Sequence, residues 1–225
     1  MQTSNINHPT IDQLSEFVAG SLPMSRALCI SAHIEHCEQC KQQVNQLTAL
    51  GTLQLESIKD APSEPKLLQQ VMQRIRSQKP ETTTTEVAPE TLRDAFIPRC
   101  LSQLVQGSID NLNWLRVSGS VKLASLCTDT NGSKLALVRI KAGGKMAHHH
   151  HTDDEITVVL KGSYSDADGV YKAGDYIFRD TQHKHKPVAS IDSECICLIT
   201  MDGPIEFTGL FYRLFNPLLR RNHAV

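Results

Sequence analysis

The chain has 225 residues, enough for one large domain or two small ones. Its formal net charge is −1 and charged residues make up 21% of the sequence, so bulk electrostatics favour neither nucleic acid nor an anionic membrane as a partner. Residues 1–10 lack the features of a signal peptide, and no stretch approaches the roughly 20 apolar residues of a membrane span. We therefore expect a soluble cytoplasmic protein that contacts no membrane and binds no nucleic acid directly. Its seven cysteines should be mostly thiols or metal ligands.

Residues 1–78 have the apolar spacing of short helices. The apolar positions from Ile11 to Leu22 approximate a helical period, which Pro23 ends. A second helix is expected after Ser25 and a third over residues 44–55. A fourth short helix, near residues 66–77, carries an apolar stripe formed by Leu67, Leu68, Val71, Met72 and Ile75.

The pattern then changes twice. Residues 79–91 are polar and low in complexity, which predicts a linker. After about residue 110 the apolar residues alternate with a period of two, and Gly, Asp and Asn turns separate the segments, as in a barrel or sandwich. Residues 209–220 fit either a helix or a closing strand. The strands expected before them are 121–127, 134–140, 155–160, 176–179 and 194–201.

The first candidate site is the segment His33-x3-Cys37-x2-Cys40. Thiolate and imidazole ligands suit Zn²⁺ in a tetrahedral site. On one straight helix, the step from residue 33 to residue 40 would span roughly 10 Å, too far for one ion with bonds of about 2.0–2.3 Å. We therefore expect a helix break after His33. Both cysteines would then lie in the first turn of the next helix, where the helix dipole favours thiolate.

A tetrahedral zinc site needs a fourth ligand, and His8, Cys29 and His36 are the candidates. Cys29 lies one helical turn behind His33 and would stretch the geometry further. His36 is adjacent to Cys37 and would point away from it. We favour His8, because it comes from a separate segment and can close the tetrahedron from the other side.

This set resembles the zinc anti-sigma domain, whose signature is an upstream His followed by His-x3-Cys-x2-Cys. His8, His33, Cys37 and Cys40 match that signature residue by residue. In that family, the helical domain holds an extracytoplasmic-function sigma factor in the cytoplasm and blocks its access to RNA polymerase. The resemblance implies that the helix near residues 66–77 helps to clamp the sigma factor; the alternative is a helix that packs on its own domain.

The second candidate site includes the internal run of four histidines at residues 148–151. Alternate residues of an extended strand face the same side, so His149, His151 and Glu155 can all point into a barrel. Such a set suits Zn²⁺, Mn²⁺, Fe²⁺ or Ni²⁺. A further ligand is expected near residues 180–187, where His183 and His185 also share parity, so parity does not choose between them.

The spacing Gly-x4-His-x-His-x3-Glu-x6-Gly over residues 144–162 resembles the first cupin motif. In the second motif, His185 follows the Gly-Asp pair at 174–175 at a distance that resembles the ChrR-type cupin pattern, and the x-Pro after it also resembles that pattern. We therefore choose His185 as the ligand, with His183 as the alternative. Cys195 and Cys197 share parity in a late strand and are expected to be core residues rather than ligands.

Nearly the whole chain resembles ChrR-type zinc-dependent anti-sigma factors. The resemblance implies a multidomain α + β protein: a small all-α zinc-binding helical domain (1–78), the linker (79–91) and an all-β cupin barrel of the double-stranded β-helix or jelly-roll type (92–225). It implies zinc in the helical domain and zinc or another divalent transition metal in the cupin. It also implies a one-to-one complex with a group IV sigma factor, released in response to singlet oxygen or related oxidative stress. A homodimer through the cupin is compatible with it.

The alternative function is a metal-dependent cupin enzyme of the dioxygenase or isomerase type, since cupins with these ligands also catalyse reactions. Such an enzyme would need open coordination positions and a substrate pocket, which the sequence does not show. It would also have no use for a helical zinc domain and a long polar linker. We therefore expect a regulatory binding protein rather than an enzyme.

Overall fold

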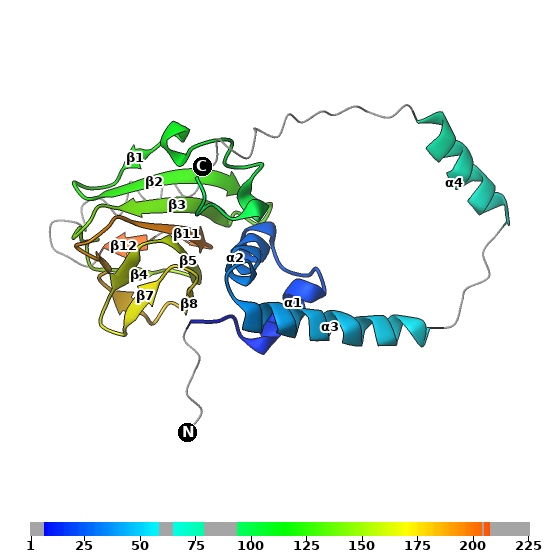
Figure 1. The fold of residues 1–225 in the computed structure, drawn as a ribbon, viewed down its shortest axis with the longest axis horizontal. Coiled ribbons are helices and arrows are strands. Elements are labelled where there is room, and N and C mark those ends of the chain that lie inside the picture. The colour runs from blue at the N-terminus through cyan, green and yellow to red at the C-terminus, as the bar shows by residue number, and fades with distance from the viewer. Residues whose placement is uncertain (1–6, 59–64, 79–93, 204, 208–225) are drawn as a thin grey trace, which may run out of the picture.

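The computed structural model describes residues 7–58, 65–78, 94–203 and 205–207. Helices come first and strands follow, which confirms the predicted fold class of a helical part joined to a cupin-like β part (Figure 1). The predicted linker and the undecided segment 209–220 lie outside the described residues. The helices are α1 (Ile11–Val18), α2 (Met24–Ile34), α3 (Glu38–Glu56) and α4 (Pro65–Ser77), with 3₁₀ turns η2 (Arg99–Leu101) and η3 (Ile109–Asn111) before the sheet.

The helix boundaries follow from capping. Thr10 accepts a hydrogen bond from the Gln13 amide while the Gln13 side chain accepts one from the Thr10 amide, a capping box that starts α1. Helix α2 ends at Ile34, and Cys37 is the N-cap of α3, its sulfur accepting from the amide of Cys40. The predicted break between His33 and the cysteine pair is therefore confirmed.

The β part contains a six-stranded antiparallel sheet in the order β1-β2-β3-β11-β5-β8 and two three-stranded sheets, β10-β6-β7 and β12-β4-β9. The five predicted strands are all present, whereas most of the two- and three-residue strands were not expected. The strands are β1 (Leu115–Arg116), β2 (Val121–Thr128), β3 (Lys134–Ile140), β4 (His149–His151), β5 (Glu155–Lys161), β6 (Ser163–Ser165), β7 (Val170–Lys172), β8 (Tyr176–Arg179), β9 (Lys184–His185), β10 (Val188–Ala189), β11 (Cys195–Met201) and β12 (Ile205–Phe207).

The large sheet is buried on both faces. One face packs inside the barrel, with Val159, Ile177 and Cys197 in a cluster that also includes residues of the small sheets. The opposite face, with Val158 and Leu198, forms one continuous core with the helices, including Ile30 of α2. Strands β5 and β11 are consequently buried at six consecutive positions. The helical part and the barrel therefore share a core, and α2 lies against the sheet (Figure 1).

Polar contacts reinforce this interface. The amide and hydroxyl of Ser25 both donate to Asp129 Oδ2, at 2.9 and 2.6 Å. Arg26 pairs with Asp154 at 3.1 Å and also with Asp202, so α2 is tied to the two loops that flank β5 and β11. At the other end of α2, the Glu35 carboxylate accepts from the amides of residues 99 and 100 in η2. The position of α2 is thus fixed at both ends.

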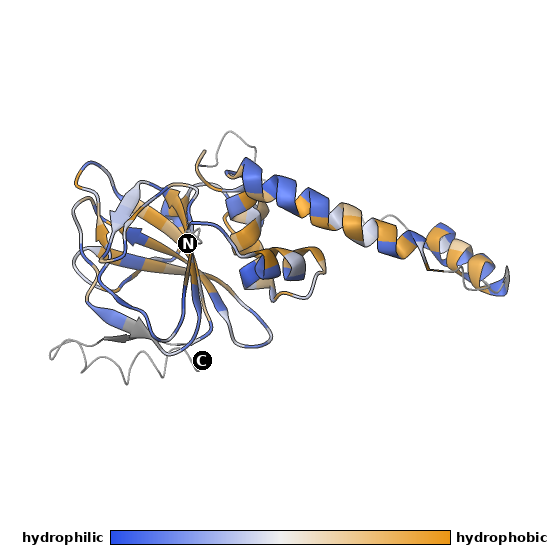
Figure 2. Ribbon diagram, turned by 90° about the horizontal axis from the view of Figure 1, so that it is seen from below, coloured by the Kyte–Doolittle hydropathy of each residue, from blue (hydrophilic) through white to orange (hydrophobic). Residues whose placement is uncertain are grey.

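Apolar side chains remain exposed on α4 and on the second half of α3, which projects away from the barrel (Figure 2). All five residues of the α4 apolar stripe are between 40% and 65% exposed. On α3, Leu50, Leu53 and Leu55 are more than half exposed. Among the described residues, no helix combines the length and apolar character that crossing a membrane requires.

Candidate metal centres

The helical part brings the four predicted residues of the first site together. The ligand atoms of His8, His33, Cys37 and Cys40 all lie within 4.8 Å of one another. His8 Nδ1 is 3.3 Å from the sulfur of Cys37, 3.4 Å from that of Cys40 and 3.4 Å from His33 Nε2. Two sulfurs and two imidazole nitrogens thus converge on one point, which is the donor set of a tetrahedral zinc site.

The imidazole of His33 is held by the barrel. Its Nδ1 lies 2.7 Å from the carbonyl oxygen of Gly174, in the turn between β7 and β8. Because a carbonyl can only accept, Nδ1 carries the proton and Nε2 turns a lone pair toward the sulfurs. Burial, together with the nearby His8 and His36 rings, lowers the pKa of His33 to about 4. The ring is therefore neutral at physiological pH, as a metal ligand must be.

The two thiols of this cluster lie close together at a partly buried position. Burial and the neighbouring sulfur of Cys37 raise the pKa of the Cys40 thiol to about 12. Two neighbouring sulfurs, one of them buried, would not both ionise unless a positive charge compensated them. A coordinated metal deprotonates such thiols outright. The residues of this cluster therefore fit a metal ion, and the thiolate–imidazole set favours zinc.

The barrel brings His149, Glu155 and His185 to one cavity, with a volume of about 40 Å³. Strands β4 and β9 pair His149 directly with His185, so both side chains face the same side of the small sheet. Glu155, at the start of β5, is buried and accepts a hydrogen bond from Thr157 at 3.1 Å. Most other lining residues are apolar: Val138, Ile140, Met146, Tyr164, Pro187, Cys197 and Ile199.

The two imidazoles of this cavity face each other through their Nε2 atoms. His149 Nε2 and His185 Nε2 are 3.0 Å apart. His149 Nδ1 is 2.9 Å from the carbonyl of Ala147, and His185 Nδ1 is 3.2 Å from Asp166 Oδ2. Both of these partners are acceptors, so Nδ1 of each ring carries a proton. The two Nε2 atoms and the Glu155 carboxylate line one cavity, and this nitrogen and oxygen donor set fits a divalent metal ion.

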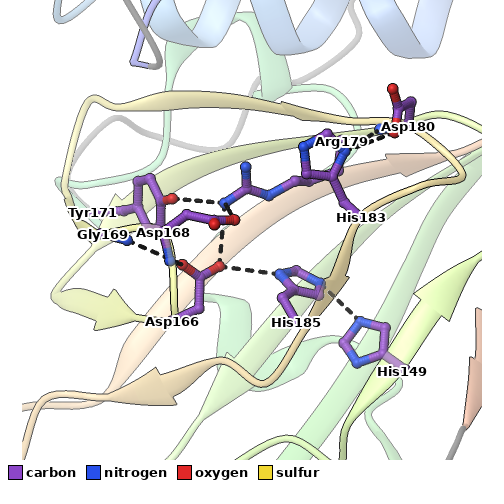
Figure 3. A network of polar contacts seen from close by, with 9 residues as sticks. All are labelled: His149, Asp166, Asp168, Gly169, Tyr171, Arg179, Asp180, His183 and His185. Atoms are coloured by element: carbon purple, nitrogen blue, oxygen red, sulfur yellow. Dashed lines mark hydrogen bonds and ion pairs between the residues drawn. The ribbon is translucent and has the colours of Figure 1, made fainter.

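A buried ionic network supports His185 (Figure 3). The side chain of Asp166 is fully buried and pairs with Arg179 at 3.2 Å, while Arg179 also pairs with Asp168 and donates to Tyr171 Oη at 2.6 Å. Burial alone would raise the pKa of Asp166, but hydrogen bonds from His185 and the Asp168 amide and the charge of Arg179 lower it to about 2. Asp166 is therefore a carboxylate that orients His185, as carboxylates commonly do for histidine ligands of metals.

Other predicted residues have different positions. The side chain of His151 lies outside what the structure describes, although its backbone is part of β4. His183 does not line the cavity; its ring is 41% exposed and pairs with Asp180 at 2.7 Å. Cys195 and Cys197 are buried in the barrel core as expected, with their sulfurs 3.6 Å apart. Cys29 is buried in the core shared with the barrel.

Several functional residues were missed by sequence reasoning. Asp166 and Asp168 were interpreted only as turn residues, and Gly174 only as part of a motif. Arg179 carried a usable signal, because it pairs with Glu155 across β5 and β8 and therefore faces the same side of the sheet. A charged residue at an inward position requires a buried partner. No sequence signal pointed to the Gly174 carbonyl, since its contact with His33 spans 141 residues.

This fold and these two clusters define a class of protein in which a helical His/Cys module is joined to a cupin-like barrel. Residues 102–205 match the family described as the ChrR cupin-like domain. The anti-sigma-E factor ChrR of Cereibacter sphaeroides is 31% identical over 219 residues, which cover 96% of this chain and 99% of that protein. The chain therefore belongs to the ChrR family of anti-sigma factors.

The crystal structure of Rhodobacter sphaeroides SigE in complex with the anti-sigma ChrR is similar over both parts of the chain. Its TM-score is 0.74 at 25% sequence identity, and the match covers 87% of this chain and 98% of that chain. The similarity therefore includes the helical module as well as the barrel.

Proposed function

We propose that this chain binds and inhibits an extracytoplasmic-function sigma factor, in a one-to-one complex formed by its helical module. The observation that carries the proposal is the exposed apolar stripe on α4 and the exposed leucines of α3, in a chain that belongs to the ChrR family. An apolar helix face that no described part of the chain covers is the kind of surface that a groove on a partner binds. The crystallised ChrR relative was solved in complex with SigE, which supports a sigma factor as the partner.

In this proposal, a zinc ion is bound by His8, His33, Cys37 and Cys40. The ion fixes the position of the first turn of α3. Zinc would supply the positive charge that keeps both sulfurs ionised. Cys37 caps α3 and His33 lies in the last turn of α2, so the site sets the angle between these helices. The direction in which α3 presents its exposed leucines therefore depends on the site.

We further propose that the barrel is a sensor rather than an enzyme. His149, His151, Glu155 and His185 would hold zinc or another divalent transition metal, whose charge would keep the converging imidazoles together. The membership of the chain in the ChrR family of anti-sigma factors favours a sensor over an enzyme. Singlet oxygen attacks imidazole and thiolate groups. Loss of a ligand would loosen the metal-dependent structure and release the sigma factor.

The test is co-purification of the chain with an extracytoplasmic-function sigma factor of the same organism, with metal content measured on the complex. The expected result is a one-to-one complex that contains zinc and dissociates after exposure to singlet oxygen. A wild-type chain that binds no sigma factor would contradict the proposed inhibition. A complex that dissociates equally well when His185 is replaced by Ala would contradict the barrel as the sensor.

A further inference from the structure

Strand β8 and the turn before it contact both candidate metal centres. At the N-terminal end, the Gly174 carbonyl accepts the hydrogen bond from His33 Nδ1 at 2.7 Å. At the first residue of β8, the Tyr176 amide donates to the carbonyl of Asn7 at 3.0 Å, and Asn7 is the residue before His8. The Tyr176 ring also packs against His33, with ring centroids 5.8 Å apart. Two of the four residues in the helical centre are therefore positioned by this end of β8.

The C-terminal end of β8 reaches the other centre. Arg179 pairs with Asp166 at 3.2 Å, and Asp166 in turn holds His185 at 3.2 Å (Figure 3). Arg179 also lies opposite Glu155 in the register of β5 and β8. The same four-residue strand thus ends beside the carboxylate that orients His185 and opposite Glu155.

Between these ends the strand is firmly held. It pairs with β5 at every position from Tyr176 to Arg179, and Gly174 donates to the Val159 carbonyl at 2.8 Å. At about 3.3 Å per residue, the path from Gly174 to Arg179 is roughly 17 Å long. A short, fully paired strand moves as a unit, so a displacement at one end reaches the other.

We propose that β8 couples the two metal centres. The Gly174 carbonyl positions His33 for the helical centre, and the Arg179–Asp166 pair positions His185 for the barrel centre. The inference rests on the proposed function, because it takes both clusters to be metal sites. Under this proposal, the barrel supplies the carbonyl that positions His33 in the helical centre. A change in the metal occupancy of the barrel centre therefore changes the metal affinity of the helical centre. By linkage, the effect works equally in the reverse direction.

The hydrogen bond to His33 can be tested with Co²⁺ in place of zinc. Thiolate ligation gives Co²⁺ a charge-transfer absorption that the nitrogen and oxygen ligands of the barrel do not, so titration of the full chain reports the helical centre separately. Gly174 has φ +97°, and a Cβ there would meet the Cβ of His36 at 3.3 Å. Gly174→Ala should therefore shift the carbonyl and weaken Co²⁺ binding at the helical centre about 10-fold or more.

The matched control is Gly143→Ala. Gly143 also lies in a barrel turn with positive φ, +65°, but a Cβ there would meet only the side chain of Ile191, at 3.6 Å. Thermal unfolding of both variants would show that each retains the fold. Equal Co²⁺ affinity in the two variants would overturn the role of Gly174.

The coupling itself is tested at the far end, with Asp166→Asn. Loss of the carboxylate should lower the metal affinity of the barrel by about 10–100-fold. If β8 couples the centres, it should also change the Co²⁺ affinity of the helical centre by about fivefold, although Asp166 makes no contact there. The control is Asp180→Asn, which removes an exposed carboxylate that pairs with His183 outside the cavity.

Equal helical-centre affinity in the Asp166 and Asp180 variants would overturn the coupling. A wild-type chain that shows no thiolate absorption with Co²⁺ would overturn both the coupling and the proposed metal in the helical module. A wild-type chain that binds Co²⁺ but no sigma factor would contradict only the proposed function. The comparison of the Gly174 and Gly143 variants and that of the Asp166 and Asp180 variants both measure Co²⁺ affinity in the absence of a sigma factor.

Discussion

The two candidate metal centres differ in what surrounds them. In the barrel, the His185 ring is held by Asp166, and that carboxylate is itself held by Arg179, all within one domain. In the helical module, the equivalent hydrogen bond to His33 comes from the Gly174 carbonyl on the other side of the interface. The barrel centre is therefore self-contained, whereas the helical centre depends on its neighbour. This difference is compatible with the proposal that the helical module responds to the state of the barrel.

The largest effect is expected when the helical centre is destroyed. Cys37→Ala combined with Cys40→Ala removes both sulfurs, and with them a metal-binding free energy on the order of 10 kcal/mol. We expect the zinc content to fall by one ion per chain and the sigma-factor affinity to fall at least about 100-fold, or about 2.7 kcal/mol. Metal analysis and a binding titration measure the two effects. Cys29→Ala, at a buried cysteine outside the cluster, should leave both unchanged.

Destroying the barrel centre should have a different outcome. Glu155→Ala removes a buried carboxylate from the cavity, so one metal ion per chain should be lost from the barrel. Because the exposed surface of α4 is untouched, sigma-factor binding should persist, while dissociation under singlet oxygen should disappear. His183→Ala is the matched control, since that ring lies outside the cavity. A response that survives in the Glu155 variant would remove the distinction between a sensing and a binding centre.

The binding surface can be changed without touching either centre. Leu68 and Ile75 lie seven residues apart on α4, on the same helix face, and are 65% and 59% exposed. Leu68→Gln or Ile75→Gln should each weaken sigma-factor binding by about 2 kcal/mol, roughly 30-fold, with zinc content and thermal stability unchanged. Ile191→Gln, at a barrel residue that is 84% exposed, should have no effect on binding. Equal affinities in all three variants would mean that α4 is not the binding surface.

The smallest effect is expected at the interface between the two parts. Arg26→Met breaks the pairs with Asp154 and Asp202, in which the arginine side chain is 22% exposed. Partial exposure limits the loss, so we expect the free energy of unfolding to fall by about 1–2 kcal/mol in a urea titration. Arg116→Met, at an exposed position on β1, should change it by less than about 0.5 kcal/mol. Indistinguishable stabilities would show that apolar packing alone joins the two parts.

Local features of the sequence predicted much of the helical centre. The length of a straight helix from His33 to Cys40 excluded a single helix, and the structure has the break. The alternation of side chains along a strand predicted that His149 and Glu155 point into one cavity, and both residues line it. Both predictions succeeded because helix and strand geometry are regular. Parity could not separate His183 from His185, and the structure shows why. Strand β9 begins only at Lys184, so His183 lies in the preceding turn and obeys no alternation.

Long-range contacts were beyond such reasoning. The sequence did not indicate that the helices cover the outer face of the sheet. The apolar run Ile156–Leu160 in β5, interrupted only by Thr157, was the available sign, because a strand exposed on one face would alternate. The Asp166–Arg179 pair and the Gly174 carbonyl depend on how separate segments meet in three dimensions, which local spacing does not encode.

The position of α2 against the sheet also has a consequence for synthesis on the ribosome. Its Ser25 bonds a residue 104 positions later in the chain, and its Arg26 pairs with one 176 positions later. At about 5–20 residues per second, the second partner emerges roughly 10–35 seconds after the helix. During that interval the apolar face of α2 has no sheet to cover it. The nascent chain is thus most prone to misassociate before β11 is made, and a product truncated there would keep that face uncovered.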